Sequence, residues 1–182
     1  MKIALIGKNG SGKSVLCDWL SSQGYSVISL SDQVRDELTR RHLPHTRDNL
    51  VTVANELKTT NGASVLAKRA IEHSEQLSSD QIVFDSVRHP DEVILLQQHA
   101  VQIVGIDAPI HIRYDRIRQR NRASDQIDFK TFEHHDNREN SGQSSGQHIN
   151  QCLQYCDIIF QNDRDIAQLT DQVSQWIMQW DD

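Results

Sequence analysis

Aromatic residues, cysteines and long apolar runs are all scarce in this chain, and each scarcity excludes a class of protein. Aromatic residues make up 5% of the 182 residues, so we expect an aliphatic core. The three cysteines, Cys17, Cys152 and Cys156, form no CxxC motif and no disulfide framework, which indicates reduced thiols. No apolar stretch of about 18 residues is present, and the N-terminus resembles a strand more than a signal peptide. We therefore expect a cytoplasmic protein that does not span a membrane.

Basic residues are fewer than acidic residues in this chain. The chain has 19 Lys and Arg residues against 25 Asp and Glu residues, which gives a formal net charge of −6. This balance disfavours a general binder of nucleic acid or of anionic membranes, although a local basic cluster can still serve one anionic ligand. A length of 182 residues suits one domain with a substantial core, so we treat residues 1–182 as a single unit.

Short β-like runs recur along the chain, and helix-length segments separate them. Strands that alternate with helices predict an α/β fold, with a five-stranded parallel sheet and helices on both of its faces. The runs are residues 2–7, 25–30, 81–85, 101–107 and 157–161. The last segment has apolar residues at the spacing of one helical face, which we expect to pack on the sheet. These residues are Ile166, Leu169, Val173, Ile177 and Trp180.

Two inserts interrupt this alternation. Residues 42–79 are expected to form a long, largely helical excursion between the second and third strands. Residues 121–146 are polar and rich in Ser, Gln and Asn, which is typical of either a disordered loop or a mobile lid. The second insert has no cysteine cluster, and its adjacent His134 and His135 would not share a helical face, so we expect no metal site there.

Three glycines cluster in GKNGSGKS, residues 7–14, after the first strand. Gly7, Gly12, Lys13 and Ser14 fit the phosphate-loop pattern G-x-x-x-x-G-K-[ST]. Glycines let consecutive backbone N–H groups turn toward phosphate oxygens, and the following helix adds its positive N-terminal end. Lys13 is expected to reach the β- and γ-phosphates, and the Ser14 hydroxyl to ligate Mg²⁺. The residues expected to hold ATP are Gly7, Asn9, Gly10, Ser11, Gly12, Lys13 and Ser14.

A second ligand for Mg²⁺ is expected at the end of the third strand. The apolar run QIVFD ends in Asp85. The carboxyl ends of parallel strands face the ligand crevice of an open sheet. Mg²⁺ takes a carboxylate either directly or through water, so Asp85 is our metal candidate. The alternative is an ordinary role for Asp85 as a helix cap or turn former.

The segment ISLSDQVRDEL, after the second strand, resembles nucleoside monophosphate kinases. That family has Ser-Thr-Gly-Asp-x-x-Arg at this point, and Asp32 and Arg35 stand at the matching Asp and Arg. The resemblance implies that Arg35 binds the phosphate of an acceptor nucleotide, beside Asp32. A solvated helix start with Ser31 as its cap explains Asp32 equally well. It does not explain Arg35, whose charge opposes the helix dipole there.

A second pair stands at the end of the third strand, in DSVRHPDEV. The kinase family has Asp-Gly-x-Pro-Arg here; Asp85 and Arg88 are retained, whereas Gly and Pro are not in the family's places. This form is similar to small archaeal and phage-type kinases of the superfamily, and to kinase-like domains fused to some deoxycytidylate deaminases. The resemblance implies that Arg88 is a second clamp on the acceptor phosphate, for which a planar guanidinium is suited.

The fourth strand is followed by DAPIHIRYDRIRQRNR, which holds five arginines within ten residues. Arg113, Arg116 and Arg120 share one helical face. The kinase resemblance places Arg116 and Arg120 at two arginines that contact the transferred phosphates, where positive charge supplies most of the catalysis. Two alternatives stay open. One is a solvated helix in which Asp115 pairs with Arg113 and Arg118, and the other is a track for nucleic acid.

Three further residues are expected to contact the substrate. Glu92 lies near the point where adenylate kinases read the base with a glutamine, and a carboxylate would favour guanine or cytosine donors. An ordinary helix start with Pro90 at its first position is the alternative. In DNRENSG, Arg138 stands where lid arginines of such kinases reach the nucleotide. Arg47 is our candidate from the first insert.

The resemblance covers nearly the whole chain and implies an ATP- and Mg²⁺-dependent kinase of nucleoside monophosphates, acting as a monomer or homodimer. One alternative is a hydroxyl acceptor, as in dephospho-CoA kinases or a kinase of bases in DNA, with Asp32 as the base. Another is a regulatory ATPase without an acceptor. The chain has no NKxD-like motif for guanine, which disfavours a GTPase switch. The expected catalytic residues are Lys13, Asp85, Arg88, Arg116 and Arg120.

Overall fold

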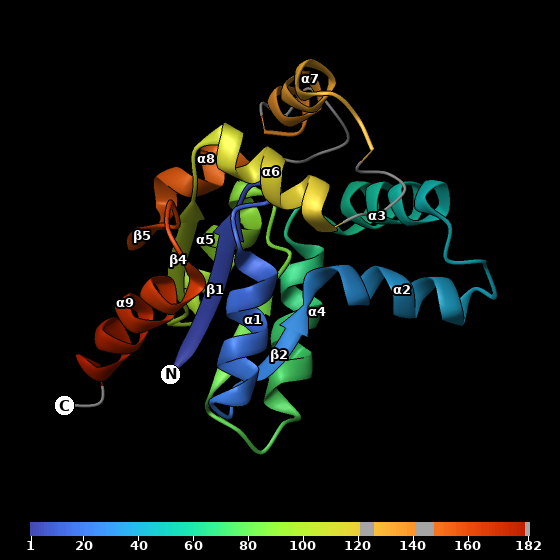
Figure 1. The fold of residues 1–182 in the computed structure, drawn as a ribbon. Coiled ribbons are helices and arrows are strands. Elements are labelled where there is room, and N and C mark those ends of the chain that lie inside the picture. Colours follow the sequence, from blue (N-terminus) through green and yellow to red (C-terminus); the bar gives the residue numbers. More distant parts are fainter. Residues whose placement is uncertain (121–125, 141–147, 181–182) are drawn as a thin grey trace.

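Parallel strands form one sheet in the order β2-β3-β1-β4-β5 (Figure 1). The computed structural model describes residues 1–120, 126–140 and 148–180. Within these residues all five strands pair in parallel, and each lies inside one of the runs predicted from sequence, so the predicted fold class is confirmed. The strands are β1 (Lys2–Gly7), β2 (Ser26–Ser29), β3 (Ile82–Asp85), β4 (Gln102–Asp107) and β5 (Ile158–Gln161).

Helices cover both faces of the sheet (Figure 1). They are α1 (Lys13–Ser22), α2 (Leu30–Arg40), α3 (Arg47–Asn61), α4 (Val65–Glu75), α5 (Pro90–Gln98), α6 (Ile110–Arg120), α7 (Phe129–Asn140), α8 (Ile149–Cys152) and α9 (Ile166–Met178), with a 3₁₀ turn η2 (Leu153–Tyr155). Helices α1 and α9 contact each other on one face, and α4, α5 and α8 lie on the other. None of the described helices is long and apolar enough to cross a membrane.

The central strand β1 supplies both cores by alternation. Ile3 and Leu5 pack with α1 and α9, whereas Ala4 and Ile6 pack with the helices of the opposite face. All four are at most 1% exposed. Full burial of one such aliphatic side chain contributes roughly 1.5–3 kcal/mol. The two cores are mainly aliphatic, as the low aromatic content predicts.

The first insert is only partly an excursion. Helix α4 buries Ala67, Ala70 and Ile71 in the core shared with the sheet, so it covers the sheet instead of leaving it. Helices α2 and α3 extend away from the sheet in Figure 1 and form a lobe, of which only α3 lies within the predicted insert 42–79. The boundary of that lobe therefore differs from the prediction.

Residues 129–140 of the second insert form the helix α7, so a disordered loop is the wrong expectation for them. Phe132 is 3% exposed and Asp136 is 6% exposed, which shows that the helix packs against the body of the protein. Residues 121–125 and 141–146 of the predicted lid lie outside the described residues. In Figure 1, α7 lies above α6 at the edge of the sheet where the strands end.

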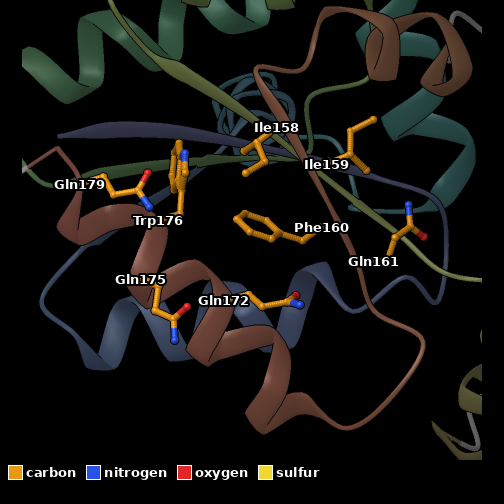
Figure 2. Close-up of a pocket in the computed structure, with 8 residues that line it drawn as sticks. All are labelled: Ile158, Ile159, Phe160, Gln161, Gln172, Gln175, Trp176 and Gln179. Carbon is orange, nitrogen blue, oxygen red and sulfur yellow. The ribbon is translucent and has the colours of Figure 1, made fainter.

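The last helix, α9, packs with the middle of the predicted face. Leu169 and Val173 are buried and Ile177 packs against the same core, together with Trp176, which was not predicted. Ile166 and Trp180, at the two ends of the predicted face, are 40% and 54% exposed. Trp176 lies edge-on to Phe160 of β5, with 6.2 Å between the ring centroids. A cavity of about 440 Å³ lies between β5 and α9 and is shown in Figure 2. None of the eight residues that line it is ionisable, so we assign no chemistry to it.

The lobe is attached to α4 through one buried carboxylate. Glu37 of α2 is 4% exposed and accepts hydrogen bonds from Arg40 at 2.5 Å, Arg41 at 2.7 Å and Arg69 at 3.3 Å. The hydrogen bond from Arg40, followed by that from Arg41, lowers the pKa of Glu37 from 4.5 to about 2 against the opposing effect of burial. Because Arg69 lies on α4, this carboxylate joins the base of the lobe to the sheet.

We predict that Glu37→Gln lowers the free energy of unfolding at pH 7 by about 2 kcal/mol, since hydrogen bonds to a charged group are lost. The folded-state pKa lies below the unfolded one, so the contribution of Glu37 is fully present above pH 4.5 and is lost as the pH falls toward 2. Urea unfolding of wild type and variant across this range measures the difference. Glu72→Gln, an exposed change on α4, is the matched control. A stability difference that does not change with pH would contradict the assignment.

Candidate functional site: a phosphate loop at the carboxyl edge of the sheet

The loop GKNGSGKS joins β1 to α1, as predicted. Two of its glycines, Gly10 and Gly12, stand where neighbouring atoms leave no room for a Cβ. Gly10 and Gly12 have positive φ angles of 79° and 107°. A Cβ at Gly10 would lie 2.6 Å from the backbone oxygen of Arg113, and a Cβ at Gly12 would lie 2.2 Å from Nδ2 of Asn162. Both the backbone conformation and the lack of space exclude other residues. The loop is therefore a rigid cradle whose shape its neighbours impose.

A cavity of about 550 Å³ opens over this cradle, a volume in the range of small-molecule sites. Its lining comes from the loop, from the start of α1, from α6 and from the segment after β5. The lining residues outside the loop are Val15, Arg116, Ile117, Gln119, Arg120, Asn162, Arg164 and Ile166. Of the expected ATP contacts, Gly7 does not line the cavity, because it ends β1 beside the backbone oxygen of Ile106. Ser11 lines it, but its backbone N–H already donates to the oxygen of Lys8.

Lys13 is the electrostatic centre of the site. Burial lowers its pKa, the nearby Asp85 carboxylate raises it, and the Arg88 and Arg120 guanidinium groups lower it. Asp85 also acts on Cys17, one turn further along α1, whose pKa rises to about 12 chiefly through burial. Lys13 at the start of α1 therefore interacts electrostatically with Asp85 at the end of β3, with Arg88 in the segment that follows, and with Arg120 of α6. The catalytic roles that the sequence assigns to these four residues stay predictions.

Arg116 contacts the protein instead of facing open space. Its guanidinium donates to the backbone oxygen of Asn162 at 3.0 Å, to the Asn162 side chain at 3.2 Å and to the oxygen of Arg164 at 3.1 Å. Burial lowers the pKa of Arg116. This contact differs from the predicted one, because Arg116 lines the cavity while holding the segment after β5.

Asn162 is a site residue that sequence reasoning missed. Its side chain is buried, and Nδ2 donates to the Ser11 backbone oxygen at 2.8 Å while Oδ1 accepts from Arg116. The only sequence signal is a polar QND directly after the last strand. An amide can donate and accept at once, so Asn162 ties the loop to α6.

Arg113 has a structural role that the solvated-helix alternative did not anticipate. It is 3% exposed and forms two 2.7 Å hydrogen bonds to the Asp136 carboxylate of α7. It also donates to the backbone oxygens of Ala108 and Asn9 at 3.0 and 3.1 Å. The expected pairing with Asp115 is therefore wrong. A single side chain joins α6, α7 and the phosphate loop.

Glu92 does not point toward a ligand. It is 1% exposed, and Oε2 accepts from the backbone N–H groups of Arg88 at 2.9 Å and His89 at 3.1 Å. Oε1 lies 3.3 Å from the ammonium group of Lys58. These contacts form a capping box at the start of α5. The ordinary helix start is the better interpretation, and we do not retain base recognition by Glu92.

The four predicted acceptor arginines come from different parts of the chain. Arg35 donates to Asp32 at 2.5 Å and to Ser31 at 2.9 Å at the start of α2. Arg88 is exposed and directly follows the site strand β3. Arg47 begins α3 and Arg138 lies in the last turn of α7; both are exposed, and neither lines the 550 Å³ cavity.

The donor set at the loop fits a nucleotide-bound Mg²⁺. Ser14 offers a hydroxyl in the first turn of α1, and Asp85 offers a carboxylate beside Lys13. The described residues hold no cluster of three or more His, Cys, Asp or Glu side chains that suits a metal by itself. Mg²⁺ bound with a nucleotide needs only one or two protein ligands, because phosphates and water supply the rest. The donor chemistry of these two residues fits such an ion, and their role as its ligands stays a prediction.

The fold and the loop define a P-loop protein with a kinase-like fold. Residues 3–142 match a family model described as an AAA domain. A UPF0200 protein of Methanosarcina barkeri is 33% identical over 140 residues, which cover 75% of each chain. A UPF0200 protein of Thermococcus onnurineus is 32% identical over 142 residues, which cover 75% of this chain and 77% of that one. The chain belongs to this AAA-domain family and is related to the UPF0200 proteins.

Solved structures with the same fold include small kinases. The shikimate kinase of Bacteroides thetaiotaomicron aligns with a TM-score of 0.60 at 15% identity, covering 100% of this chain and 98% of that one. The shikimate kinase of Acinetobacter baumannii aligns with a TM-score of 0.57 at 14% identity, covering 98% and 93%. At these identities the likeness establishes the fold and leaves the acceptor open.

We predict that Asp136→Asn lowers the free energy of unfolding by about 3 kcal/mol, because it leaves the buried Arg113 guanidinium without its counter-charge. Denaturant unfolding measures the loss, and hydrogen exchange should show it first in residues 129–140. Glu133→Gln, an exposed change on the same helix, is the control and should stay within about 0.5 kcal/mol of wild type. An Asp136→Asn protein as stable as wild type would contradict the role given to this pair.

Proposed function

We propose that this protein is an ATP-dependent kinase that transfers the γ-phosphate of ATP to a nucleoside monophosphate. The observation that carries the proposal is that Lys13 of the phosphate loop interacts electrostatically with one carboxylate, Asp85, and with the guanidinium groups of Arg88 and Arg120. Three cations and one carboxylate there suit a phosphoryl group in transfer, with its divalent ion.

The donor nucleotide would occupy the 550 Å³ cavity. Its phosphates would lie against the loop N–H groups, the start of α1 and Lys13. Its base would lie beside Arg164 and Ile166, in the segment after β5 that lines the cavity. Mg²⁺, held by Ser14 and Asp85, would neutralise negative charge on the β- and γ-phosphates. Arg116 would fix the base end of the cavity by holding Asn162.

The acceptor would lie on the side of the lobe formed by α2 and α3. Arg35 and Arg88 would bind its phosphate, because two guanidinium groups match a phosphate dianion in geometry and charge. Arg47 and Arg138 are candidates for further contacts from α3 and α7. No side chain needs to remove a proton, since the attacking phosphate oxygen is already anionic. Lys13, Arg88 and Arg120 would stabilise the charge on the transferred group.

A hydroxyl acceptor is the second candidate, and Asp32 would be its base. Asp32 is 56% exposed at the start of α2. A hydroxyl must lose its proton during attack, and Asp32 would accept it. The Arg35 guanidinium, 2.5 Å from this carboxylate, favours the phosphate acceptor.

Coupled ADP release from Mg²⁺-ATP is the experiment that tests this function. The panel contains all ribo- and deoxynucleoside monophosphates, with dephospho-CoA, shikimate and oligonucleotides as alternatives. We predict stimulation by one or more monophosphates. Arg35→Ala and Arg88→Ala should each lower the stimulated kcat/KM by about 100-fold, since each removes a charge from the phosphate acceptor. Arg118→Ala, an exposed change on α6, is the matched control.

Stimulation by hydroxyl acceptors alone would contradict the monophosphate assignment and favour the second candidate. ADP release that no acceptor stimulates would contradict both and favour a regulatory ATPase. Stimulation that survives both arginine substitutions would show that the acceptor binds elsewhere.

A further inference from the structure

A continuous chain of hydrogen bonds runs from the acceptor lobe to the phosphate-loop site. Arg35 Nη1 donates to Ser31 Oγ at 2.9 Å, and Ser31 Oγ lies 2.9 Å from Ser29 Oγ. Ser29 Oγ donates to Ser86 Oγ at 3.1 Å, and Ser86 Oγ donates to Asp85 Oδ2 at 3.1 Å. Each step is within hydrogen-bonding distance, so a charged group at each end is joined through three hydroxyls.

The direction of this chain follows from counting protons. A serine hydroxyl has one proton to donate and can accept two. Ser86 gives its proton to Asp85, and Ser29 gives its own to Ser86. In the contact between Ser31 and Ser29, Ser31 must therefore be the donor. Arg35 only donates. All donors consequently point toward the Asp85 carboxylate, and such aligned hydrogen bonds polarise and strengthen one another.

The sheet register places the two halves of the chain side by side. In the parallel pairing of β2 with β3, Ser29 is the direct partner of Asp85. Ser29 ends β2 and precedes α2, while Asp85 ends β3. The contact between lobe and loop site is thus built on backbone pairing and does not depend on flexible side chains alone.

Two of the serines depart from their ordinary behaviour. Ser29 is the N-cap residue of α2, yet its hydroxyl caps no backbone N–H of the helix. An N-cap serine commonly makes that bond, whereas here the Ser29 hydroxyl bonds Ser31 and Ser86 in the hydrogen-bond chain instead. Ser86 has a positive φ of 64°, an uncommon conformation for a residue with a side chain. Such strain is a feature of sites where the surroundings fix one geometry.

We propose that Ser29, Ser31 and Ser86 are positioning residues that hold the Asp85 carboxylate toward Mg²⁺ and couple it to Arg35. The hydrogen-bond chain holds Oδ2 of Asp85, so that Oδ1 would be left to ligate Mg²⁺. It also makes the acceptor arginine and the metal carboxylate parts of one hydrogen-bonded unit. This inference rests on the proposed function only in its assignment of Mg²⁺ to Asp85.

Titration calorimetry with the ATP analogue AMP-PNP tests the positioning role without any acceptor. The quantity measured is the Mg²⁺ increment, the ratio of Kd in EDTA to Kd in Mg²⁺. Ser86→Gly removes the hydroxyl, and glycine adopts the positive φ without strain. Ser29→Ala breaks the hydrogen-bond chain one step further from Asp85. We expect each to lower the increment about tenfold and to leave Kd in EDTA unchanged. Ser29→Thr should restore the wild-type increment, and Ser26→Ala on the same strand is the control.

The coupling to Arg35 has its own test in a double-mutant cycle. Arg35→Ala should lower the increment about threefold, although this residue is outside the cavity lining. Combined with Ser86→Gly, it should produce no further loss, because the connection is already broken. Effects that multiply in the double variant would overturn the coupling.

Wild-type increments in both Ser86→Gly and Ser29→Ala would overturn the positioning role. A wild-type protein without any Mg²⁺ increment would overturn the metal assignment and the inference with it. Melting temperatures identify a variant that fails to fold, in which case Ser31→Ala at the exposed helix start replaces it. A normal Mg²⁺ increment without acceptor-stimulated ADP release would count against the proposed kinase function and leave the positioning role standing.

Discussion

The lack of free space around the phosphate loop is the constraint on which the site depends. Arg113 donates to the backbone of Asn9 and Asn162 donates to the backbone of Ser11, so two side chains from distant elements hold the loop. The backbone oxygen of Arg113 lies where a Cβ at Gly10 would be, and the side-chain amide of Asn162 lies where a Cβ at Gly12 would be. A cradle fixed in this way keeps its N–H groups oriented before any phosphate binds, which lowers the cost of binding.

Helix α6 shows how one residue type can perform different tasks on one helix. Arg113 is buried in a bidentate pair with Asp136 and anchors α7. Arg116 holds the segment after β5 through Asn162, and Arg120 acts on the electrostatics of Lys13. The neighbours decide the task of each guanidinium, since a buried arginine requires a partner charge whereas a cavity-lining one can meet a ligand.

Local patterns in the sequence predicted the sheet and the phosphate loop, and the roles of the other candidate site residues stay predictions. Alternating apolar runs located the five strands, and GKNGSGKS located the loop, because both depend on neighbouring residues alone. The errors have a tertiary origin. Glu92 accepts from the backbone just before its helix and pairs with Lys58 of α3, Arg113 pairs with Asp136 across 23 positions, and α4 returns to the sheet. No spacing rule in a single sequence specifies such partners.

A crystal structure with AMP-PNP and Mg²⁺ would show whether this loop is the donor half of a phosphoryl-transfer site. We expect phosphates on the loop, the γ-phosphate between Lys13 and Arg120, and Mg²⁺ beside Ser14 and Asp85. We also expect the γ-phosphate to face Arg88 and the lobe. A nucleotide bound elsewhere, or one whose γ-phosphate points away from Asp85 and Arg88, would contradict this expectation.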